Sequence, residues 1–491
     1  MARSASRGTG KPAPQVLRPD GGGMPDENSR KDPAVLGVLR NPTYRRLFSA
    51  QVLSLIGSGL TTVALGLLAY DIAGADAGVV LGTALALKMV AYVGIAPIAG
   101  AFATYLPRRA FLVGLDLCRA GLVLVLPFVT EVWQIYVLVF AFQAFSAAFT
   151  PTFQATIPDV LPEEEDYTRA LSLSRLAYDL ESLLSPLFAG FLLTIISFHF
   201  LFTGTTIGFL ASAALVLSAA LPAARAVRRE GGVFAKMTHG VRLYLATPRL
   251  RGLLALSFAL AAAASMVIVN TVVYVRAEAG GSNADVALLL AAYGVGSMVV
   301  ALSLPRILHR LQARSVMLAG TLILGVGLLL AAPLPGFAEA LGVWALLGAG
   351  ASMIATPSGL LLRRSCEEAD RPAIFAAQFA LSHACFLLTY PLAGYLGSVV
   401  GLGATFLVMA VATLLAAGGA LLLWPRNDPE VIEHTHEAME HAHFHVHDAH
   451  HEHEHEGWEG PEPHRHPHRH STVRHAHRFV IDDHHPVWPR P

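Results

Sequence analysis

The sequence contains little charge and few cysteines for its length. Only 14% of its 491 residues are Asp, Glu, Lys or Arg, whereas 54% are hydrophobic. This composition excludes an ordinary soluble domain and indicates a protein that spans a lipid bilayer several times. The 3 cysteines, Cys118, Cys366 and Cys385, fall within apolar runs or on the cytoplasmic side of them, so we expect no disulfide framework.

A phosphate-binding loop is also absent. The only Gly-Lys pair is Gly10-Lys11, and Pro12 follows it, so the sequence offers no Walker motif. This absence excludes ATP as the energy source, and we expect neither an enzyme nor a permanently bound cofactor. We also expect no nucleic-acid partner.

The sequence is instead rich in apolar runs of about 18 to 25 residues, the length that a helix needs to cross a bilayer. Twelve such runs predict the fold class, an all-α membrane protein with twelve transmembrane helices in two pseudo-symmetric six-helix halves. The predicted spans are residues 48–70, 79–103, 110–130, 133–155, 170–194, 198–221, 252–275, 284–304, 315–334, 338–361, 374–398 and 402–424.

Basic residues gather in alternate connections between these spans. They precede the first span and follow the second, sixth, eighth and tenth, whereas the opposite loops are short and poor in Lys and Arg. By the positive-inside rule, both termini are then cytoplasmic. We therefore expect a multi-pass protein of the plasma (inner) membrane. We also expect it to be a monomer.

An internal repeat divides the chain. Residues 163–166 match residues 367–370 at an offset of 204, and residues 189–192 match residues 393–396 at the same offset. Two halves related in this way are typical of transporters that bind their substrate between the halves and rock to expose it to either side. The predicted domains are a disordered cytoplasmic N-terminus (1–40), an N-terminal half (41–221), a cytoplasmic linker (222–251), a C-terminal half (252–425) and a cytoplasmic tail (426–491). Residues 232–245 of the linker fit a short amphipathic helix.

Two six-span halves, a long basic central loop and the loop after the second span together resemble the major facilitator superfamily over about residues 40–425. In that family the loop reads Gly, three residues, Asp, a basic residue, any residue, Gly and two basic residues. Gly100, Arg108 and Arg109 match this gating loop, but Thr104 stands in place of the Asp. The resemblance therefore implies only part of the usual gate.

Two further features extend the resemblance. Asp116 and Arg119, further along the third span, are candidates to replace the missing Asp of the gating loop. The start of the first span, Gln51 to Ser58, resembles the branch of the superfamily that contains siderophore, macrolide and nickel-resistance exporters.

Three ionisable residues, Arg175, Asp179 and Glu181, lie inside the fifth predicted span. Asp179 follows Arg169 by ten residues, which places it about 15 Å deep, near the middle of a ~30 Å hydrocarbon core. Charges at this depth are costly and often serve transport, so Asp179 is the principal candidate for coupling. Arg175 shares its helix face and Glu181 does not. The alternative is that Arg175 and Asp179 only neutralise each other.

Three other side chains could act with this group. The repeat places His383 opposite Asp179 and Cys385 opposite Glu181, and carboxylate and imidazole ligands suit a borderline divalent metal. Packing against neighbouring helices is the alternative role for His383 and Cys385. Lys88 is the only lysine in a span and could balance a carboxylate, repel cations or bind an anionic substrate.

The tail is rich in histidine and holds 18 of the 22 histidines. Many alternate with other residues, so they lie on one side of an extended chain, where several imidazoles can bind one metal ion. A solvated low-complexity tail or a pH sensor is the alternative. The predicted metal ligands are His434, His436, His441, His443, His445, His447, His450, His451, His453, His455, His464, His466, His468 and His470.

These observations predict a secondary active transporter that exports a divalent transition metal in exchange for protons. Nickel is the first choice, since the combination of such a membrane domain with a His-rich terminus resembles the nickel-resistance exporters, and cobalt or zinc would also fit. A multidrug or siderophore exporter with an accessory tail is the main alternative. A metal-sensing membrane receptor is a third, which the repeat disfavours.

Overall fold

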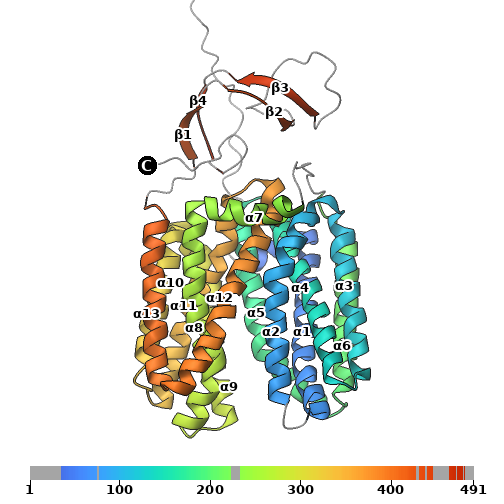
Figure 1. Ribbon diagram of the computed structural model, residues 1–491, viewed down its shortest axis with the longest axis vertical. Coiled ribbons are helices and arrows are strands. Elements are labelled where there is room, and N and C mark those ends of the chain that lie inside the picture. Colours follow the sequence, from blue (N-terminus) through green and yellow to red (C-terminus); the bar gives the residue numbers. More distant parts are fainter. Residues whose placement is uncertain are drawn as a thin grey trace, which may run out of the picture.

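Twelve long helices run side by side in the computed structural model (Figure 1). The structure describes residues 35–73, 77–222, 233–426, 431–436, 439–445, 464–470, 473–478 and 480. The first six long helices are α1 (Pro42–Ala73), α2 (Ala77–Phe102), α3 (Arg108–Val125), α4 (Val132–Val160), α5 (Glu164–Leu193) and α6 (His199–Ser218). The second six are α8 (Pro248–Val273), α9 (Asn283–Arg310), α10 (Ala313–Ala331), α11 (Phe337–Arg364), α12 (Arg371–Val399) and α13 (Leu402–Leu423).

Every predicted span corresponds to one of these helices. In the part of the chain that the structure describes, 11 helices are both long and apolar enough to cross a membrane. The twelfth, α5, has sufficient length at 30 residues, but it carries several charges along that length. The predicted fold class is confirmed, with α5 as the helix that departs most from a simple apolar span.

The packing of the helices repeats between the two halves. In the first half α1 packs on α6, α3 on α6, α2 on α4 and α3 on α4; in the second half α8 packs on α13, α10 on α13, α9 on α11 and α10 on α11. The halves meet through α2 with α12 and through α5 with α9, which are again equivalent pairs. The contacts therefore follow the internal repeat of the sequence.

A shorter helix, α7 (Val233–Ala246), lies in the connection between the halves and packs against α12 and α2. Its position agrees with the amphipathic helix expected over residues 232–245. Gly240 makes this packing possible, because a Cβ atom there would lie only 2.3 Å from the carbonyl oxygen of Ala373. We call the end of the helix bundle at which α7 lies the α7 end.

Two segments differ from the expected boundaries. The segment expected to be disordered up to residue 40 ends in a 3-10 helix, η1 (Val35–Arg40), in which Val38 is buried. Beyond α13, four strands pair in an otherwise helical protein: β1 (Val431–His436) with β4 (Val473–Arg478), and β2 (Met439–His445) with β3 (His464–His470). Both pairs are antiparallel.

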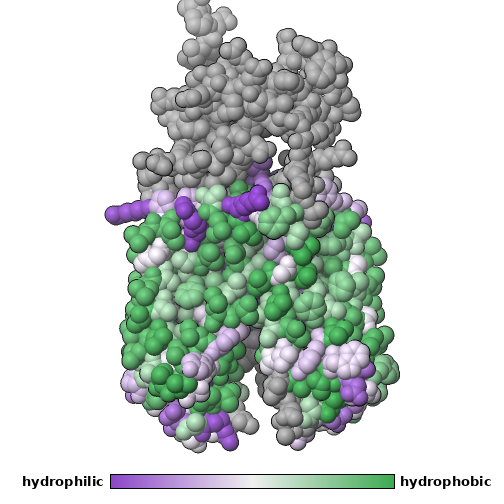
Figure 2. All heavy atoms as spheres, in the orientation of Figure 1, coloured by the Kyte–Doolittle hydropathy of each residue, from purple (hydrophilic) through white to green (hydrophobic). Residues whose placement is uncertain are grey.

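The two halves are in contact at the α7 end and part at the opposite end. Figure 2 shows a cleft between the halves at that opposite end, below a broad apolar surface that suits contact with lipid. At the α7 end, Gly100 of α2 lies against α12 so closely that an added Cβ would be 2.5 Å from the Cβ of Ala376. The structure is thus closed at one end only.

Candidate functional site: a cavity between the halves

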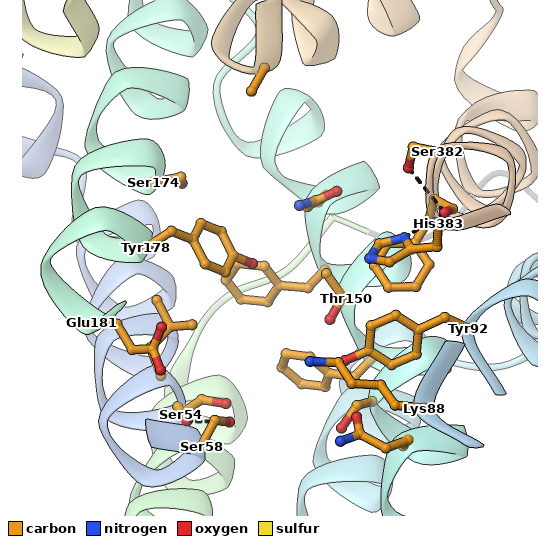
Figure 3. Close-up of a pocket in the computed structure, with 18 of the residues that line it drawn as sticks. Ser54, Ser58, Lys88, Tyr92, Thr150, Ser174, Tyr178, Glu181, Ser382 and His383 are labelled. Atoms are coloured by element: carbon orange, nitrogen blue, oxygen red, sulfur yellow. Dashed lines mark hydrogen bonds between the residues drawn. The ribbon is translucent and has the colours of Figure 1, made fainter. Parts of the chain in front are cut away.

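A cavity of about 820 Å³ lies between the two halves, lined by helices from both (Figure 3). Most of its polar lining comes from the first half, which contributes hydroxyl and amide side chains on α1, α4 and α5. The basic and acidic residues that line it are Lys88, Arg119, Arg175, Glu181 and His383. Apolar and aromatic side chains with a few convergent polar groups are typical of a small-molecule site.

Glu181 and Lys88 extend into this cavity from opposite walls, α5 and α2 (Figure 3). Lys88 is the cation whose field acts on the Glu181 carboxylate. Among the described residues, Glu181 has no hydrogen-bond partner, and Lys88 contacts the ring of Tyr92 at 5.4 Å from its centroid. Gly59 of α1 lies beside this part of α5, since an added Cβ there would lie 2.0 Å from Ser185 Oγ and 3.0 Å from Glu181 Oε1. Glu181 is therefore available to bind a proton or a cationic group.

His383 belongs to an aromatic wall on the side of Lys88. Its ring stands edge-on to Tyr92 with centroids 4.8 Å apart and lies 4.2 Å from the ring of Phe379. The Nδ1 atom is 2.7 Å from the Phe379 carbonyl oxygen. A carbonyl only accepts hydrogen bonds, so Nδ1 carries the proton and Nε2 is left as an acceptor. His383 can thus accept a hydrogen bond from a bound molecule.

Asp179, the principal candidate of the sequence analysis, does not line the cavity. Its carboxylate pairs with Arg175 at 2.9 Å and accepts a 2.6 Å hydrogen bond from Ser297 of α9. Arg175 Nε also donates to the Ser297 hydroxyl, at 3.0 Å. The predicted shared face of Arg175 and Asp179 is confirmed, and the pair joins α5 to α9 across the boundary between the halves. Glu181 faces the cavity because it lies on another side of α5.

The proposed metal set of Asp179, Glu181, His383 and Cys385 is not assembled. Cys385 is buried beside the Leu381 carbonyl oxygen at 3.3 Å and does not line the cavity. In the described part of the chain, no three His, Cys, Asp or Glu residues come together as a metal site. The equivalence between α5 and α12 was correct, but equivalent helices do not direct equivalent positions to one point.

Asp116 and Arg119 pair with each other inside the first half. The Asp116 carboxylate also accepts a 2.8 Å hydrogen bond from Ser212 of α6, and the Arg119 guanidinium lies 4.0 Å from the centroid of the Phe149 ring. The pair fixes α3 against α6 and brings Arg119 to the cavity wall. It does not connect the halves, so it does not replace the missing Asp of the gating loop.

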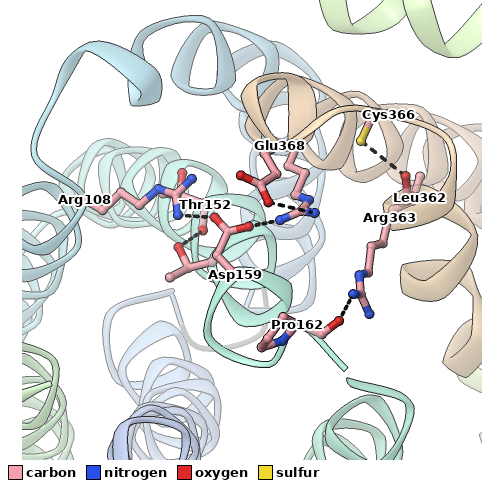
Figure 4. Close-up of polar contacts among 10 residues, drawn as sticks. Arg108, Thr152, Asp159, Pro162, Leu362, Arg363, Cys366 and Glu368 are labelled. Carbon is pink, nitrogen blue, oxygen red and sulfur yellow. Dashed lines mark hydrogen bonds and ion pairs between the residues drawn. The ribbon is translucent and has the colours of Figure 1, made fainter. Parts of the chain in front are cut away.

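Asp159, at the end of α4, provides that connection (Figure 4). Its two carboxylate oxygens pair with Arg108 of α3 and with Arg371, the first residue of α12. Nearby, Arg364 of α11 pairs with Glu164 of α5, with Nε and Oε2 2.9 Å apart. Arg108 of the predicted gating loop therefore takes part in the closed end, whereas Arg109 is exposed. The sequence analysis missed Asp159, whose only signal was a lone Asp at the end of an apolar helix.

The predicted metal ligands of the tail divide into two groups. His447, His450, His451, His453 and His455 lie outside the described residues. The other nine lie on the strands, and the backbone register places several histidines opposite one another. The facing pairs are His434 with His475, His441 with His468, His443 with His466, and His445 with His464.

The fold and the cavity define a class, the transporters of the major facilitator superfamily. A model of one of its families, described as transmembrane secretion effector, matches residues 34–363. The chain belongs to this family. A curated relative, the uncharacterized MFS-type transporter YvqJ of Bacillus subtilis (strain 168), is 24% identical over 403 residues, which cover 78% of this chain and 92% of YvqJ.

Solved structures agree on the fold. The human organic anion transporter MFSD10 (TETRAN) is 14% identical with a TM-score of 0.65, covering 78% of this chain and 99% of that one. A bacterial homologue of the iron transporter ferroportin in an outward-facing state is 16% identical with a TM-score of 0.65 and the same coverage. The fucose:proton symporter FucP of E. coli is 17% identical, with a TM-score of 0.61, covering 78% of this chain and 98% of that one. The protein is thus a multi-pass membrane transporter and not an enzyme.

Proposed function

We propose that the protein is a proton-coupled exporter of small amphipathic organic molecules. The observation that carries this proposal is the cavity of about 820 Å³ with Glu181 and Lys88 on opposite walls. Sites for small organic molecules have volumes of about 300 to 1,000 Å³. A metal ion instead needs several ligands within about 2.0 to 2.6 Å of one point, and the described part of the chain holds no such cluster.

The proposed roles of the cavity residues follow from their charges. Glu181 holds either a proton or a cationic or hydrogen-bond-donating group of the substrate, so the proton and the substrate compete for this carboxylate. Lys88 and the Nε2 atom of His383 offer an anionic or hydrogen-bonding end of the substrate two partners, and Tyr92, Phe379 and other rings receive its apolar part. The printed names of the structural relatives, an organic anion transporter and a fucose:proton symporter, are compatible with such a substrate and such coupling.

The orientation is also part of the proposal. The described part of the linker, with Arg242, Arg249 and Arg251, and the Arg-rich helix ends lie at the α7 end, which the positive-inside rule assigns to the cytoplasm. Both termini are then cytoplasmic, and the structure is open to the outside. Entry of protons from outside would drive the return of the empty site, and export of the substrate would follow, as the family description of secretion suggests.

The test compares Glu181→Gln with Asp179→Asn in proteoliposomes loaded with a pH-sensitive dye. A panel of amphipathic organic zwitterions and cations is added, with Ni²⁺, Co²⁺ and Zn²⁺ in parallel. We expect Glu181→Gln to lower substrate-induced proton movement at least ~100-fold, the lower range for the loss of a positioned proton-transfer group. Asp179→Asn should keep coupling but alter the rate. Equal coupling in Glu181→Gln and wild type, or a response to metal ions alone, would overturn the proposal.

A second candidate, export of a divalent transition metal with nickel first, draws support from the tail. The strand register sets histidine opposite histidine in four pairs. Facing residues of an antiparallel pair have Cβ atoms about 4.5 to 5.5 Å apart, and imidazole suits nickel, zinc and copper. The ferroportin homologue among the structural relatives is compatible with a metal substrate.

The tail is tested with His441, His443 and His445 replaced together by Ala, and with Ala442 and Phe444 replaced by Ser as the matched control on the same strand. We expect the triple variant to bind fewer Ni²⁺ or Zn²⁺ ions in calorimetry and the control to bind as wild type does. If the triple variant also lowers the tolerance of cells to nickel, this result would support metal export as the function. Unchanged metal binding would remove the tail as support for it.

A further inference from the structure

We propose that a second cavity, at the α7 end, is a binding site for a phosphate group that holds the two halves together. This cavity has a volume of about 260 Å³ and shares no lining residue with the central one; Figure 4 shows several of the side chains that line it. A single buried water needs only about 10 to 15 Å³ of comparable space, so the cavity has room for a much larger group. Its lining residues are Arg108, Pro158, Asp159, Pro162, Pro222, Arg363, Glu368 and Arg371.

The lining has an excess of positive charge. Three arginines face two carboxylates, which leaves one positive charge. Asp159 pairs with both Arg108 and Arg371, and Glu368 lies 3.9 Å from Arg371, so these four residues balance one another. The remaining positive charge belongs to Arg363.

Arg363 has a charge and a hydrogen-bond donor without partners among the described residues. Its Nη2 donates to the Pro162 carbonyl oxygen and its guanidinium lies 5.4 Å from the Tyr167 ring centroid, but it pairs with no carboxylate among the described residues. Its Nη1 atom is buried and has no hydrogen-bond partner there. An unpaired buried donor on a charged group costs free energy, and because Arg363 lines the cavity, a turn of its guanidinium toward an oxyanion there would give this donor a partner.

Because the cavity lies between the halves, a bound anion would affect the equilibrium between the open and closed states of this end. Arg108 comes from α3 in the first half, whereas Arg363 and Arg371 come from α11 and α12 in the second. Because α12 begins at Arg371, the positive end of its helix dipole adds to the same field. An anion that contacts arginines of both halves is bound only while this end is closed, so it favours the state that is open at the opposite end.

A phosphate group matches these arginines because their planar guanidinium groups donate paired hydrogen bonds to phosphate oxygens. The group could belong to an anionic lipid headgroup at the membrane surface or to a soluble phosphate compound. Both sources would present a phosphate group to the arginines, and an experiment can distinguish the lipid from the soluble compound.

The experiment measures the melting temperature of the purified full-length protein in nanodiscs. In discs of phosphatidylcholine alone, inorganic phosphate is titrated against sodium chloride of equal ionic strength. In a second series, phosphatidic acid replaces part of the lipid without added phosphate. The variants are Arg363→Gln, Arg363→Lys and, as the matched control, Arg310→Gln, which removes an exposed arginine at the end of α9 that lies outside the cavity lining.

We expect phosphate or phosphatidic acid to raise the melting temperature of wild type and Arg310→Gln. In Arg363→Gln the apparent dissociation constant should be at least about tenfold weaker, equivalent to ~1.4 kcal/mol, with Arg363→Lys in between. A response to phosphate in phosphatidylcholine discs identifies a soluble ligand, and a response only to phosphatidic acid identifies a lipid. A response that chloride reproduces, or that Arg363→Gln retains in full, would overturn the proposal.

Discussion

At the scale of single residues, two neighbouring acids on α5 have different surroundings. Asp179 is tied to Arg175 and Ser297 at the boundary of the halves, while Glu181 is exposed to the cavity. The sequence predicted the depth of both residues, since depth follows from counting along a helix. It could not predict which acid faces the cavity, because the rotation of α5 is set by its packing against α1 and α9.

Gly100 permits the close contact between α2 and α12 at the α7 end. A methyl group there would meet the Cβ of Ala376 at 2.5 Å, whereas Gly94 on the same helix has open space around it. We expect Gly100→Ala to weaken closure at the α7 end by ~1–3 kcal/mol, the usual cost of overpacking. Spin labels at the exposed positions of Arg109 and Arg310, one in each half, measure the change by pulsed electron resonance.

In that measurement Gly100→Ala should add a population with a longer distance between the labels. Gly94→Ala is the matched control and should leave the distance distribution unchanged. Identical distributions for Gly100→Ala and wild type would contradict the role given to this contact between α2 and α12.

At the scale of elements, one carboxylate joins three helices. Asp159 of α4 pairs with Arg108 of α3 and with Arg371 of α12, and its side chain is only 10% exposed. The sequence shows the basic partners but not the acid that joins them, because Arg371 is 212 positions away. Contacts of this kind depend on how the two halves dock, which local patterns do not encode.

Replacing Asp159 by Asn should therefore loosen the closed end. Breaking a largely buried ion pair costs about 3 to 5 kcal/mol when one partner remains charged, and here two arginines are left. We expect a lower melting temperature and a longer distance between the same two spin labels. Asp166→Asn is the control, because Asp166 pairs with Arg169 of its own helix at 2.9 Å; equal effects of the two variants would count against a link between the halves.

At the scale of the whole molecule, the two halves have largely separate cores. The largest cluster of buried apolar residues belongs to α7 and the second half apart from Ala155, and two other clusters belong to the first half apart from Leu360. The internal repeat and the lengths of the apolar runs were enough to predict this division. The shape of the cavity between the halves was not predictable, since it depends on residues that are distant in sequence.

Separate cores predict that the protein can be assembled from two chains. Residues 1–222 and 223–491, expressed together, should insert, associate and be purified as one complex with the melting temperature of the intact chain to within a few degrees. A division inside the second half, after residue 280, should give much less complex because it separates α8 from helices with which it shares a core. Similar yields from both divisions would contradict independent halves.

The pairing of the intramembrane charges determines how the membrane potential acts on the transporter. Arg175 with Asp179, Arg119 with Asp116, and Lys88 opposite Glu181 each sum to zero. The electric field therefore does little work when the unprotonated, empty protein changes conformation. A proton on Glu181 leaves one net positive charge, and moving it through 100 mV is worth about 2.3 kcal/mol. For a zwitterionic substrate, which adds no net charge, the voltage of an energised cell would then accelerate only the protonated step, and the steady-state current should report proton entry.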